Sequence, residues 1–342
     1  MSKLVLLADF FPKEYVTMDP EAAGMLAELG EDIQTVVVDD PMIRKAKKPM
    51  SVIRDFETKG IGDVVPDEAV LEAVADADYL LVHWSAVNRA VIDAAPKLKF
   101  IGSLRSGWEN VDRAYAESRG ITVRNCPGRL ADSVADLTVA FMLERNKALL
   151  RRDLVSGGGA WPSSGLYQGH VHRPLCMLTV GLVGYGYIAQ TVARRLHGFG
   201  CQIQAFDPYT PDAAFEQYGV KRVDLDTLLA TSDIVSLHAR VTEATKGMIG
   251  REQLARMKKE SIFINTARAD LVDEEALIET LREGRIQYAA MDVFAKEPIP
   301  EDYALLKLDN VLLTPHIGGN FPGMVQLSLR KILEALKAYL GS

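Results

Sequence analysis

The chain has 342 residues, of which 48% are hydrophobic and 25% are charged, a composition typical of soluble globular proteins. This length is long for one domain and suits two. The net charge of -7 argues against nucleic acid and anionic membranes as partners, because an acidic protein is repelled by both. The apolar run from Leu4 to Ala8 is too short for a signal peptide, and no apolar stretch approaches the length of a membrane span.

The first part of the chain, up to residue 124, alternates between strand and helix patterns. Apolar runs predict strands at residues 4–8, 33–38, 79–82, 98–103 and 121–124. Helices are predicted between them, at 19–29, 67–74, 88–94 and 111–118. Residues 39–66 interrupt this alternation with a basic patch, interpreted as a solvated insertion rather than a phosphate site: Arg44, Lys45, Lys47 and Lys48. Alternating strands and helices predict a parallel, doubly wound sheet.

The middle of the chain breaks the pattern. A long apolar helix is predicted from residue 130 to about residue 150. The segment 156–174 is rich in Gly, Ser and Pro and carries four aromatic or histidine side chains: Trp161, Tyr167, His170 and His172. Because no carboxylate or cysteine cluster accompanies the two histidines, a loop or a dimer arm is favoured over a metal site.

The cysteines indicate the cellular compartment. Cys126, Cys176 and Cys201 are odd in number, lie far apart and have no C-x-x-C spacing. This pattern is typical of reduced, mostly structural thiols. We therefore expect a cytoplasmic protein without a metal site.

The second half of the chain is organised around a glycine motif, Gly184-x-Gly186-x-x-Ala189, between an apolar run and an amphipathic helix pattern that ends near Phe199. Gly184 allows a tight turn, and Gly186 allows a pyrophosphate to approach the positive helix N-terminus. A second predicted strand ends at Asp207, about 20 residues later, where an acceptor for a ribose hydroxyl is expected. The alternative, a structural turn with a capping aspartate, is less favoured, and the sequence predicts a dinucleotide site.

Further elements follow the motif. Strands are predicted at 201–206, 234–237, 261–265, 287–291 and 311–313, and helices at 226–230, 251–257, 273–282 and 324–340. The dinucleotide unit is thus flanked by chain on both sides. We expect a Rossmann-type nucleotide domain at 127–316, with a dimerisation helix and arm, inserted in a flavodoxin-like substrate domain at 1–126 and 317–342. The two crossings would act as hinges around a cleft.

Three polar groups follow three of these strands. Arg268 comes after the strand at 261–265, Glu297 after the strand at 287–291, and His316 after the strand at 311–313. Because the carboxyl ends of parallel strands line one crevice, these side chains are expected to converge.

The chain resembles the D-isomer-specific 2-hydroxyacid dehydrogenase family, which includes 3-phosphoglycerate, D-lactate and glyoxylate/hydroxypyruvate enzymes. The similarity covers roughly residues 67–342 and is strongest at 184–189, 236–249, 265–273, 290–298 and 313–319. Ala269 departs from the family, which usually has glycine after its arginine. The resemblance implies an NAD-dependent oxidoreductase that interconverts a D-2-hydroxy acid and its 2-keto acid as a homodimer. A dinucleotide-sensing interaction protein of the co-repressor type is the alternative from another class.

The resemblance also implies the catalytic roles. His316 would be the proton donor, since imidazole titrates near neutral pH. Glu297 would stabilise the imidazolium and raise its pKa, and it distinguishes this chain from formate dehydrogenases, which carry glutamine there. Arg268 would bind the substrate carboxylate and carbonyl oxygen.

Cofactor contacts are implied in the same way. Asp207 is expected on the adenosine ribose and Asp292 at the nicotinamide amide. For His238, a backbone contact on the adenine-ribose side and a packing role are equal alternatives. The full set implied to contact NAD, besides Arg268, is Gly184, Gly186, Tyr187, Ile188, Asp207, His238, Thr266, Ala267, Asp292, Gly318 and Gly319.

Substrate contacts are implied for the outer domain. The stretch 104–112 matches the family's carboxylate-binding loop, with backbone N–H groups at Ser106 and Gly107 as the donors. Trp84 and Ser85 stand near the place where phosphoglycerate enzymes carry an arginine for the phosphate, and that arginine is missing here. For Trp84 and Trp108, packing at the cleft rim is an open alternative.

Charge in this loop bears on the substrate. Glu109 falls where the phosphoglycerate enzymes have a neutral amide, and Arg105 is a compensating cation if it points into the cleft. A carboxylate accepts hydrogen bonds from hydroxyls and repels phosphate. The sequence therefore predicts an unphosphorylated, hydroxyl-bearing acid as the substrate, with 3-phosphoglycerate as the alternative.

Overall fold

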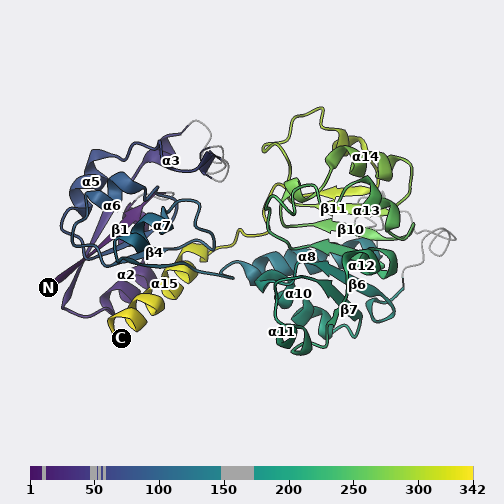
Figure 1. Cartoon of the computed structure of the whole chain (residues 1–342), viewed down its shortest axis with the longest axis horizontal. Coiled ribbons are helices and arrows are strands. Elements are labelled where there is room, and N and C mark those ends of the chain that lie inside the picture. The colour runs from purple at the N-terminus through teal and green to yellow at the C-terminus, as the bar shows by residue number, and fades with distance from the viewer. Residues whose placement is uncertain (10–12, 47–51, 53–54, 57–58, 148–172, 342) are drawn as a thin grey trace, which may run out of the picture. The chain divides into compact units, whose positions relative to one another are not determined.

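The computed structural model describes residues 1–9, 13–46, 52, 55–56, 59–147 and 173–341, and it divides into two compact units (Figure 1). Unit 1 comprises Met1–Arg129 and Phe321–Ser342, and unit 2 comprises Leu130–Asn320. The predicted arm, with Trp161, Tyr167, His170 and His172, lies outside the described residues, as do Lys47 and Lys48. Across the described ranges, no helix has the length and apolar character that crossing a membrane requires.

Unit 1 contains a parallel sheet with the strand order β2-β1-β3-β4-β5. Its strands are β1 Ser2–Ala8, β2 Ile33–Asp39, β3 Tyr79–Val82, β4 Phe100–Ser103 and β5 Thr122–Arg124. The central strands β3 and β4 are buried throughout, as expected for a sheet covered on both faces. This is the flavodoxin-like order, so the parallel, doubly wound fold predicted for this part is confirmed.

Helices cover both faces of this sheet. One face packs against α5 Glu68–Val74, α6 Arg89–Asp93 and α7 Arg113–Ser118. The other packs against α2 Pro20–Ala27 and α15 Met324–Leu340. Two short helices in unit 1, α1 Lys13–Thr17 and α3 Met42–Lys45, were not predicted, because so few residues show no periodic pattern.

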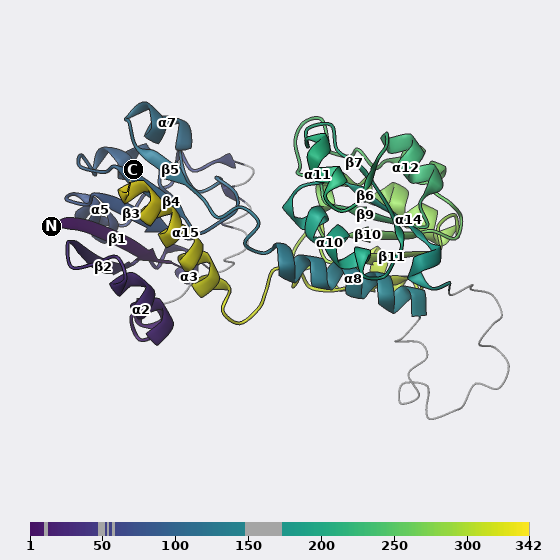
Figure 2. The ribbon, with the colours of Figure 1, turned by 90° about the horizontal axis from the view of Figure 1, so that it is seen from below.

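The two ends of the sequence meet in unit 1. Helix α15, yellow in Figures 1 and 2, lies beside the purple α2. Lys337 pairs with Glu28 at 2.7 Å, and Gln326 donates a hydrogen bond to Asp19, the N-cap residue of α2, at 2.8 Å. The last helix of the chain therefore packs in the same hydrophobic core as the first strand.

Unit 2 contains a parallel sheet with the order β12-β11-β10-β9-β6-β7-β8, a Rossmann-type arrangement with an added strand. Its strands are β6 Thr179–Val183, β7 Gln202–Phe206, β8 Lys221–Arg222, β9 Ile234–Leu237, β10 Ile262–Asn265, β11 Tyr288–Met291 and β12 Val311–Leu313. Strand β8 was not predicted, because its two residues are charged and exposed. The predicted Rossmann-type fold of this part is confirmed.

Helices cover both faces here as well. Helices α8 Ala131–Lys147 and α10 Tyr187–His197 pack side by side on one face, as Figure 2 shows. The other face carries α12 Leu225–Thr231, α13 Arg251–Arg256 and α14 Glu274–Arg282, and α11 Asp212–Glu216 follows β7. Phe199, predicted on the apolar face of α10, instead lies beyond the helix end and is 41% exposed, because Gly198 and Gly200 terminate the helix.

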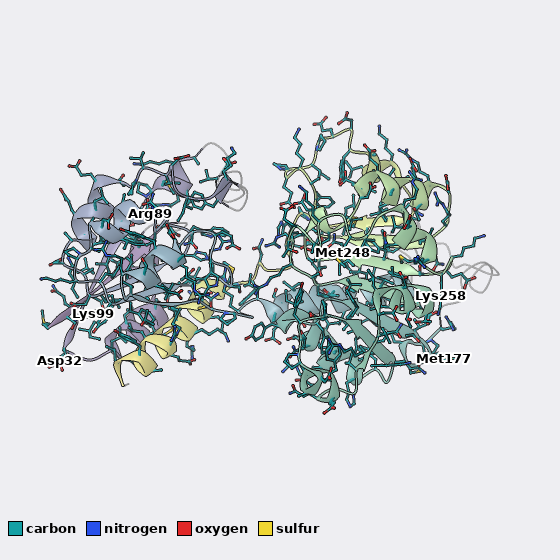
Figure 3. The ribbon with its side chains drawn as sticks, in the orientation of Figure 1. Asp32, Arg89, Lys99, Met177, Met248 and Lys258 are labelled. Atoms are coloured by element: carbon teal, nitrogen blue, oxygen red, sulfur yellow. The ribbon has the colours of Figure 1, made fainter. Side chains whose placement is uncertain are left out.

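A carboxylate joins three segments at the amino edge of the unit 2 sheet. Asp233 accepts hydrogen bonds from the Thr179 N–H at 2.8 Å and from Lys258 at 2.9 Å, and it also pairs with Arg173. Lys258 is labelled in Figure 3. Burial raises the pKa of Asp233, but the Thr179 N–H and the two cations lower it further, and the net pKa is below the ordinary value. This edge is structural, and the chemistry-bearing side chains lie at the opposite, carboxyl edge.

Candidate active site

The glycine turn after β6 has the geometry of a phosphate site. Gly184 has φ +87°, and a Cβ there would lie 2.5 Å from the backbone nitrogen of Ala239, so only glycine fits. At Gly186 a Cβ would meet open space. Helix α10 begins at Tyr187 without a side-chain cap, which leaves the first N–H groups, including that of Ile188, for an anionic ligand. These residues fit the pyrophosphate of a dinucleotide.

Asp207 lies at the end of β7 and is bound to this turn. Its carboxylate accepts hydrogen bonds from the backbone N–H groups of Tyr185 at 2.7 Å, Tyr209 at 2.8 Å and Thr210 at 3.0 Å. Burial raises the pKa of Asp207, but these hydrogen bonds lower it more, so the net pKa is below the ordinary value. The nearby Arg222 donates to the Asp207 carbonyl oxygen and pairs with Asp212. The turn therefore holds a negative charge where a ribose is expected.

We expect this charge to make NAD a better cofactor than NADP by at least 100-fold in kcat/KM. A 2'-phosphate about 4 Å from the carboxylate would be repelled by roughly 4 kcal/mol at an effective dielectric of 20. Steady-state rates with the two cofactors give the ratio. Asp207→Ser should narrow the ratio, whereas Asp302→Ser, at an exposed aspartate of unit 2, should leave it unchanged. Equal efficiency with both cofactors in the unaltered protein would contradict this role of Asp207.

His238 contacts the glycine turn through its backbone. Its N–H donates to the Val183 carbonyl oxygen at 2.7 Å, and a Cβ on Gly184 would lie 2.8 Å from the His238 carbonyl carbon. The imidazole Nε2 lies 3.0 Å from the Ser236 hydroxyl, and burial lowers the pKa of His238 to about 3. The ring is therefore neutral and buried, while the backbone of His238 lies beside the glycine turn. The two alternatives for this residue, packing and a backbone position near the cofactor, are compatible with each other.

The loop after β10 presents Arg268. Asn265 is fully buried, and its side chain accepts from the Ala267 N–H at 3.0 Å and donates to the Arg268 carbonyl oxygen at 2.9 Å. The Thr266 hydroxyl lies 2.9 Å from that of Thr138 on α8. The loop is thus fixed on two sides, while the Arg268 side chain is exposed. The sequence indicates Asn265 only as a polar residue at the end of a buried strand, and it gives no signal for the contact of Thr138.

Glu297 and His316 form a pair. The Nδ1 atom of His316 lies 2.8 Å from Oε2 of Glu297, and the other oxygen of Glu297 accepts the Phe294 N–H at 3.0 Å. Burial raises the pKa of Glu297, but hydrogen bonds from His316 and Phe294, with the charges of His316 and Arg268, lower it below its ordinary value. The carboxylate is therefore ionised, and the side chain of His316 is 37% exposed. This arrangement orients an imidazole for proton transfer.

Asp292 stabilises the loop that carries His316. It is 2% exposed, and its carboxylate accepts hydrogen bonds from the Thr314 hydroxyl, the Ile317 N–H and the Gly318 N–H at 2.5 to 2.9 Å. These residues flank His316, whose φ of +54° is unusual for a side chain other than glycine. Asp292 therefore fixes the backbone around the histidine, and its contact with the nicotinamide amide stays a prediction.

Gly318 and Gly319 lie against α8. A Cβ on Gly318 would lie 3.0 Å from Oδ2 of Asp292, and a Cβ on Gly319 would lie 2.9 Å from Leu130. The Gly318 carbonyl oxygen accepts a hydrogen bond from Ser133 at 2.7 Å. The glycines allow the histidine loop to pack closely on this helix.

The residues implied to bind substrate belong to unit 1. Ser106 and Gly107 lie in the loop after β4, which is fixed by hydrogen bonds from the Ser106 hydroxyl to Cys126 and from the Asn125 side chain to the Ser106 carbonyl oxygen. In the described part of the chain, the backbone N–H groups of Ser106 and Gly107 have no acceptor. Two adjacent donors without a protein acceptor fit a carboxylate.

Arg105 and Glu109 form an ion pair in the same loop. The Arg105 Nη2 and Glu109 Oε2 atoms are 3.5 Å apart, and the two side chains are 8% and 34% exposed. The guanidinium lies 3.6 Å from the centre of the Trp84 ring. A Cβ on Gly107 would lie 2.1 Å from both oxygens of Glu109, so the carboxylate folds over that glycine. Because Arg105 compensates the charge of Glu109, the carboxylate of Glu109 repels a phosphate less strongly than the sequence alone suggested.

Ser85 and Trp108 occupy supporting positions. Ser85 is 1% exposed and donates both its N–H and its hydroxyl to the carboxylate of Asp9. Trp108 packs on the core of unit 1 with the Arg113 guanidinium over its ring. Both residues therefore support the loops. Among the residues with described coordinates, no group of three His, Cys, Asp or Glu side chains could hold a metal ion.

Replacing Glu297 by glutamine is expected to shift the pH profile of ketone reduction toward lower pH, because a neutral amide takes the place of the carboxylate that contacts His316. The amide still accepts the His316 N–H, but it no longer compensates the imidazolium charge, so the acid form is lost at lower pH. The pH profile of kcat/KM for reduction measures this shift. Glu301→Gln, at an exposed position in unit 2, is the matched control, and an unshifted profile in Glu297→Gln would contradict the assignment.

These side chains share one edge of the unit 2 sheet. The glycine turn, Asp207, Arg268 and the Glu297–His316 pair follow the carboxyl ends of β6, β7, β10, β11 and β12 in turn. A dinucleotide-binding turn beside a cation and an acid–base pair defines the class of the protein, a dinucleotide-dependent oxidoreductase.

Comparison with known proteins identifies the family. Residues 138–318 match the model for the NAD binding domain of the D-isomer specific 2-hydroxyacid dehydrogenases. A glyoxylate reductase of Korarchaeum cryptofilum is 39% identical over 292 residues, which cover 79% of this chain and 86% of that protein. The chain belongs to the D-isomer specific 2-hydroxyacid dehydrogenase family and is an NAD-dependent oxidoreductase. The resemblance seen in the sequence is confirmed.

Two further comparisons concern length and fold. A D-3-phosphoglycerate dehydrogenase of Methanocaldococcus jannaschii is 38% identical over 307 residues, which cover 89% of this chain and 57% of that protein. The chain thus spans little more than half of that relative. The NAD-complexed D-isomer specific 2-hydroxyacid dehydrogenase of Lactobacillus delbrueckii ssp. bulgaricus has the same fold, with a TM-score of 0.74 at 24% identity over 100% of this chain and 98% of that one.

Proposed function

We propose that this protein interconverts a D-2-hydroxy acid and its 2-keto acid, and that its substrate is an unphosphorylated acid bearing further hydroxyl groups. The observation that carries the proposal is the Glu297–His316 pair, with 2.8 Å between the carboxylate and Nδ1, close to the positive charge of Arg268. An ionised carboxylate, an imidazole and a guanidinium are the groups that reduction of a 2-keto acid requires.

NAD, when bound, would supply the hydride chemistry at C2 of the substrate, and the chain's own residues handle the proton and the charge. In reduction, His316 donates a proton to the keto oxygen, and Glu297 compensates the charge of the imidazolium before transfer. In oxidation the neutral imidazole accepts the hydroxyl proton. Arg268 binds the substrate carboxylate and the carbonyl oxygen with its planar fork of donors, which stabilises negative charge on that oxygen.

The chain's own residues fit NAD. The N–H groups of Gly186, Tyr187 and Ile188 would hold the pyrophosphate, and Asp207 would accept hydrogen bonds from the ribose hydroxyls. The remaining residues that we propose near the cofactor lie around the glycine turn or at the ends of β10 to β12: His238, Thr266, Ala267, Asp292, Gly318 and Gly319.

The preference against phosphate rests on the loop of unit 1. Ser106 and Gly107 would bind the substrate carboxylate through their backbone N–H groups. Arg105, the cation of this loop, is paired with Glu109 and lies over the Trp84 ring. Binding a phosphate there would require that pair to open and would place the phosphate beside a carboxylate, whereas a hydroxyl donates to Glu109 without either cost.

A second candidate activity is that of a 3-phosphoglycerate dehydrogenase, which the 38% identical relative from Methanocaldococcus jannaschii favours. Reduction of glyoxylate, hydroxypyruvate, longer hydroxylated 2-keto acids and phosphohydroxypyruvate with NADH separates the candidates. We expect the highest kcat/KM with an unphosphorylated, hydroxylated acid. A preference for the phosphorylated acid would overturn the substrate assignment, and no turnover with any of them would favour the interaction protein.

Replacing Glu109 by glutamine is expected to raise, by about tenfold, the kcat/KM ratio of the phosphorylated acid to its unphosphorylated analogue. The change removes an anion and releases Arg105 to bind phosphate. Because Glu109 is partly exposed, solvent screens its charge, and we expect a smaller electrostatic effect than for a buried pair. Glu72→Gln, at an exposed position on α5, is the control. An unchanged ratio in Glu109→Gln would show that Glu109 does not govern this preference.

We also propose that the protein acts as a homodimer in the cytoplasm. The family resemblance and the length of α8 support the dimer, and the three free cysteines support a reducing compartment. Light scattering after gel filtration should give twice the mass of the chain. A monomer at working concentrations would contradict the dimer.

A further inference from the structure

A small cavity lies at the carboxyl edge of the unit 1 sheet. In the order β2-β1-β3-β4-β5 the chain runs from β1 to one side and later continues from β3 to the other, so the ends of β1 and β3 form the switch point where such sheets bind ligands. The cavity has a volume of about 30 Å³, and Asp9, Asp19, His83, Leu104 and Gln326 are among its lining residues. This volume suits about two water-sized groups, or one hydroxymethyl group.

Two polar atoms at the cavity have no hydrogen-bond partner within the described residues. They are Nε2 of His83 and Oε1 of Gln326, both inaccessible to bulk solvent. His83 is 6% exposed, and burial, followed by the charges of Arg129 and Arg105, holds its pKa well below the ordinary value. The ring is therefore neutral. Buried polar atoms are nearly always hydrogen-bonded, so this pair offers hydrogen-bonding capacity to a ligand group that enters the cavity.

The acidic residues of the cavity are already satisfied. Asp9 accepts the backbone N–H groups of His83, Trp84 and Ser85, and Asp19 accepts the N–H of Ala22 at 2.8 Å and the amide of Gln326. Two satisfied carboxylates repel an anion and do not call for a cation. The aliphatic side chains of Leu104, Val325 and Leu329, which also line the cavity, favour an alkyl stem.

We propose that this cavity binds a distal hydroxyl group of the substrate. A hydroxyl donates its one hydrogen to Oε1 of Gln326 and accepts a hydrogen bond from the Nε2–H of His83 in the tautomer protonated there, and its alkyl stem packs on the aliphatic wall. The cavity is continuous in sequence with the proposed carboxylate loop, since Leu104 lines it and Ser106 follows two residues later. The inference rests on the proposed function and assigns the hydroxyl preference to particular residues.

Matched substrate pairs test this assignment. The 2-keto acids of four and five carbons are compared with their analogues that carry a terminal hydroxyl, at saturating NADH. We expect a preference of about tenfold in kcat/KM for the hydroxylated member, expressed mainly in KM, for at least one chain length. The best chain length reports the depth of the cavity.

Gln326→Leu removes the acceptor and is expected to bring this preference close to one, by raising KM for the hydroxylated acid alone. Gln217→Leu, the same change at an exposed glutamine of unit 2, is the control and should keep the preference. Val325→Leu, which narrows the cavity within α15, should also reduce the preference and serves if Gln326→Leu fails to fold. Thermal unfolding checks each variant.

The outcomes separate the two proposals. If the unaltered protein reduces no 2-keto acid, the proposed function fails. If it reduces both members of each pair equally well, the function stands and the cavity assignment is overturned. If Gln326→Leu lowers kcat/KM for both members by the same factor, Gln326 has only a structural role, and the assignment is overturned as well.

Discussion

Replacing His316 by alanine is expected to lower kcat by about 10²- to 10⁴-fold in both directions, the range typical of a lost general acid–base group. The proton donor disappears for reduction and the proton acceptor disappears for oxidation. NAD binding should persist, because the glycine turn and Asp207 lie after other strands. Steady-state rates with a 2-keto acid and with its 2-hydroxy acid measure the two directions, and cofactor fluorescence measures binding.

His197→Ala is the matched control, since His197 is an exposed histidine at the end of α10 in the same unit. It should retain the activity of the unaltered protein. Near-normal rates in His316→Ala at all pH values would show that another group transfers the proton. A loss of NAD binding together with activity would instead indicate a structural role for the histidine loop.

Arg268→Ala is expected to lower kcat/KM for 2-keto acid reduction by about 10²- to 10³-fold, comparable to removing one oxyanion donor from an enzyme. The exposed guanidinium is presented by a loop that Asn265 fixes, so truncation should remove its donors, including the one to the Ala267 carbonyl oxygen, while Asn265 still holds the loop backbone. Arg268→Lys should recover only part of the rate, because an ammonium lacks the planar fork. Rates at several substrate concentrations separate kcat from KM.

Arg256→Ala, at a surface arginine of α13, is the control and should keep normal kinetics. A normal kcat/KM in Arg268→Ala would exclude the arginine from substrate binding. Full activity in Arg268→Lys would mean that only its charge matters.

The elements were predicted well where local pattern decides them. Strands β3 and β12 and helix α15 have the predicted ends, because each is an uninterrupted apolar or amphipathic run. Strand β8 escaped prediction because pairing with β7, not its own charged residues, makes it a strand. The sequence predicted the domain crossings at residues 126 and 316, while the division of the chain into two units falls after Arg129 and after Asn320.

The candidate site shows a similar division. Glycine spacing and strand-end positions pointed to Asp207, Arg268, Glu297 and His316. The supporting contacts were not predicted, because they join residues far apart in sequence. Asp9 binds the loop at His83 to Ser85 across 74 to 76 residues, and the Thr138–Thr266 contact spans 128. Contacts between residues so far apart leave no periodic pattern in the sequence, because folding of the sheets is what brings the two residues together.

The proposed activity is tested most directly by one measurement: NADH consumption with a hydroxylated 2-keto acid, followed by chiral analysis of the product. We expect one NADH to be consumed for each keto acid reduced and the D-2-hydroxy acid to be the only enantiomer formed. Formation of the L enantiomer, or no NADH consumption with any 2-keto acid tested, would contradict it.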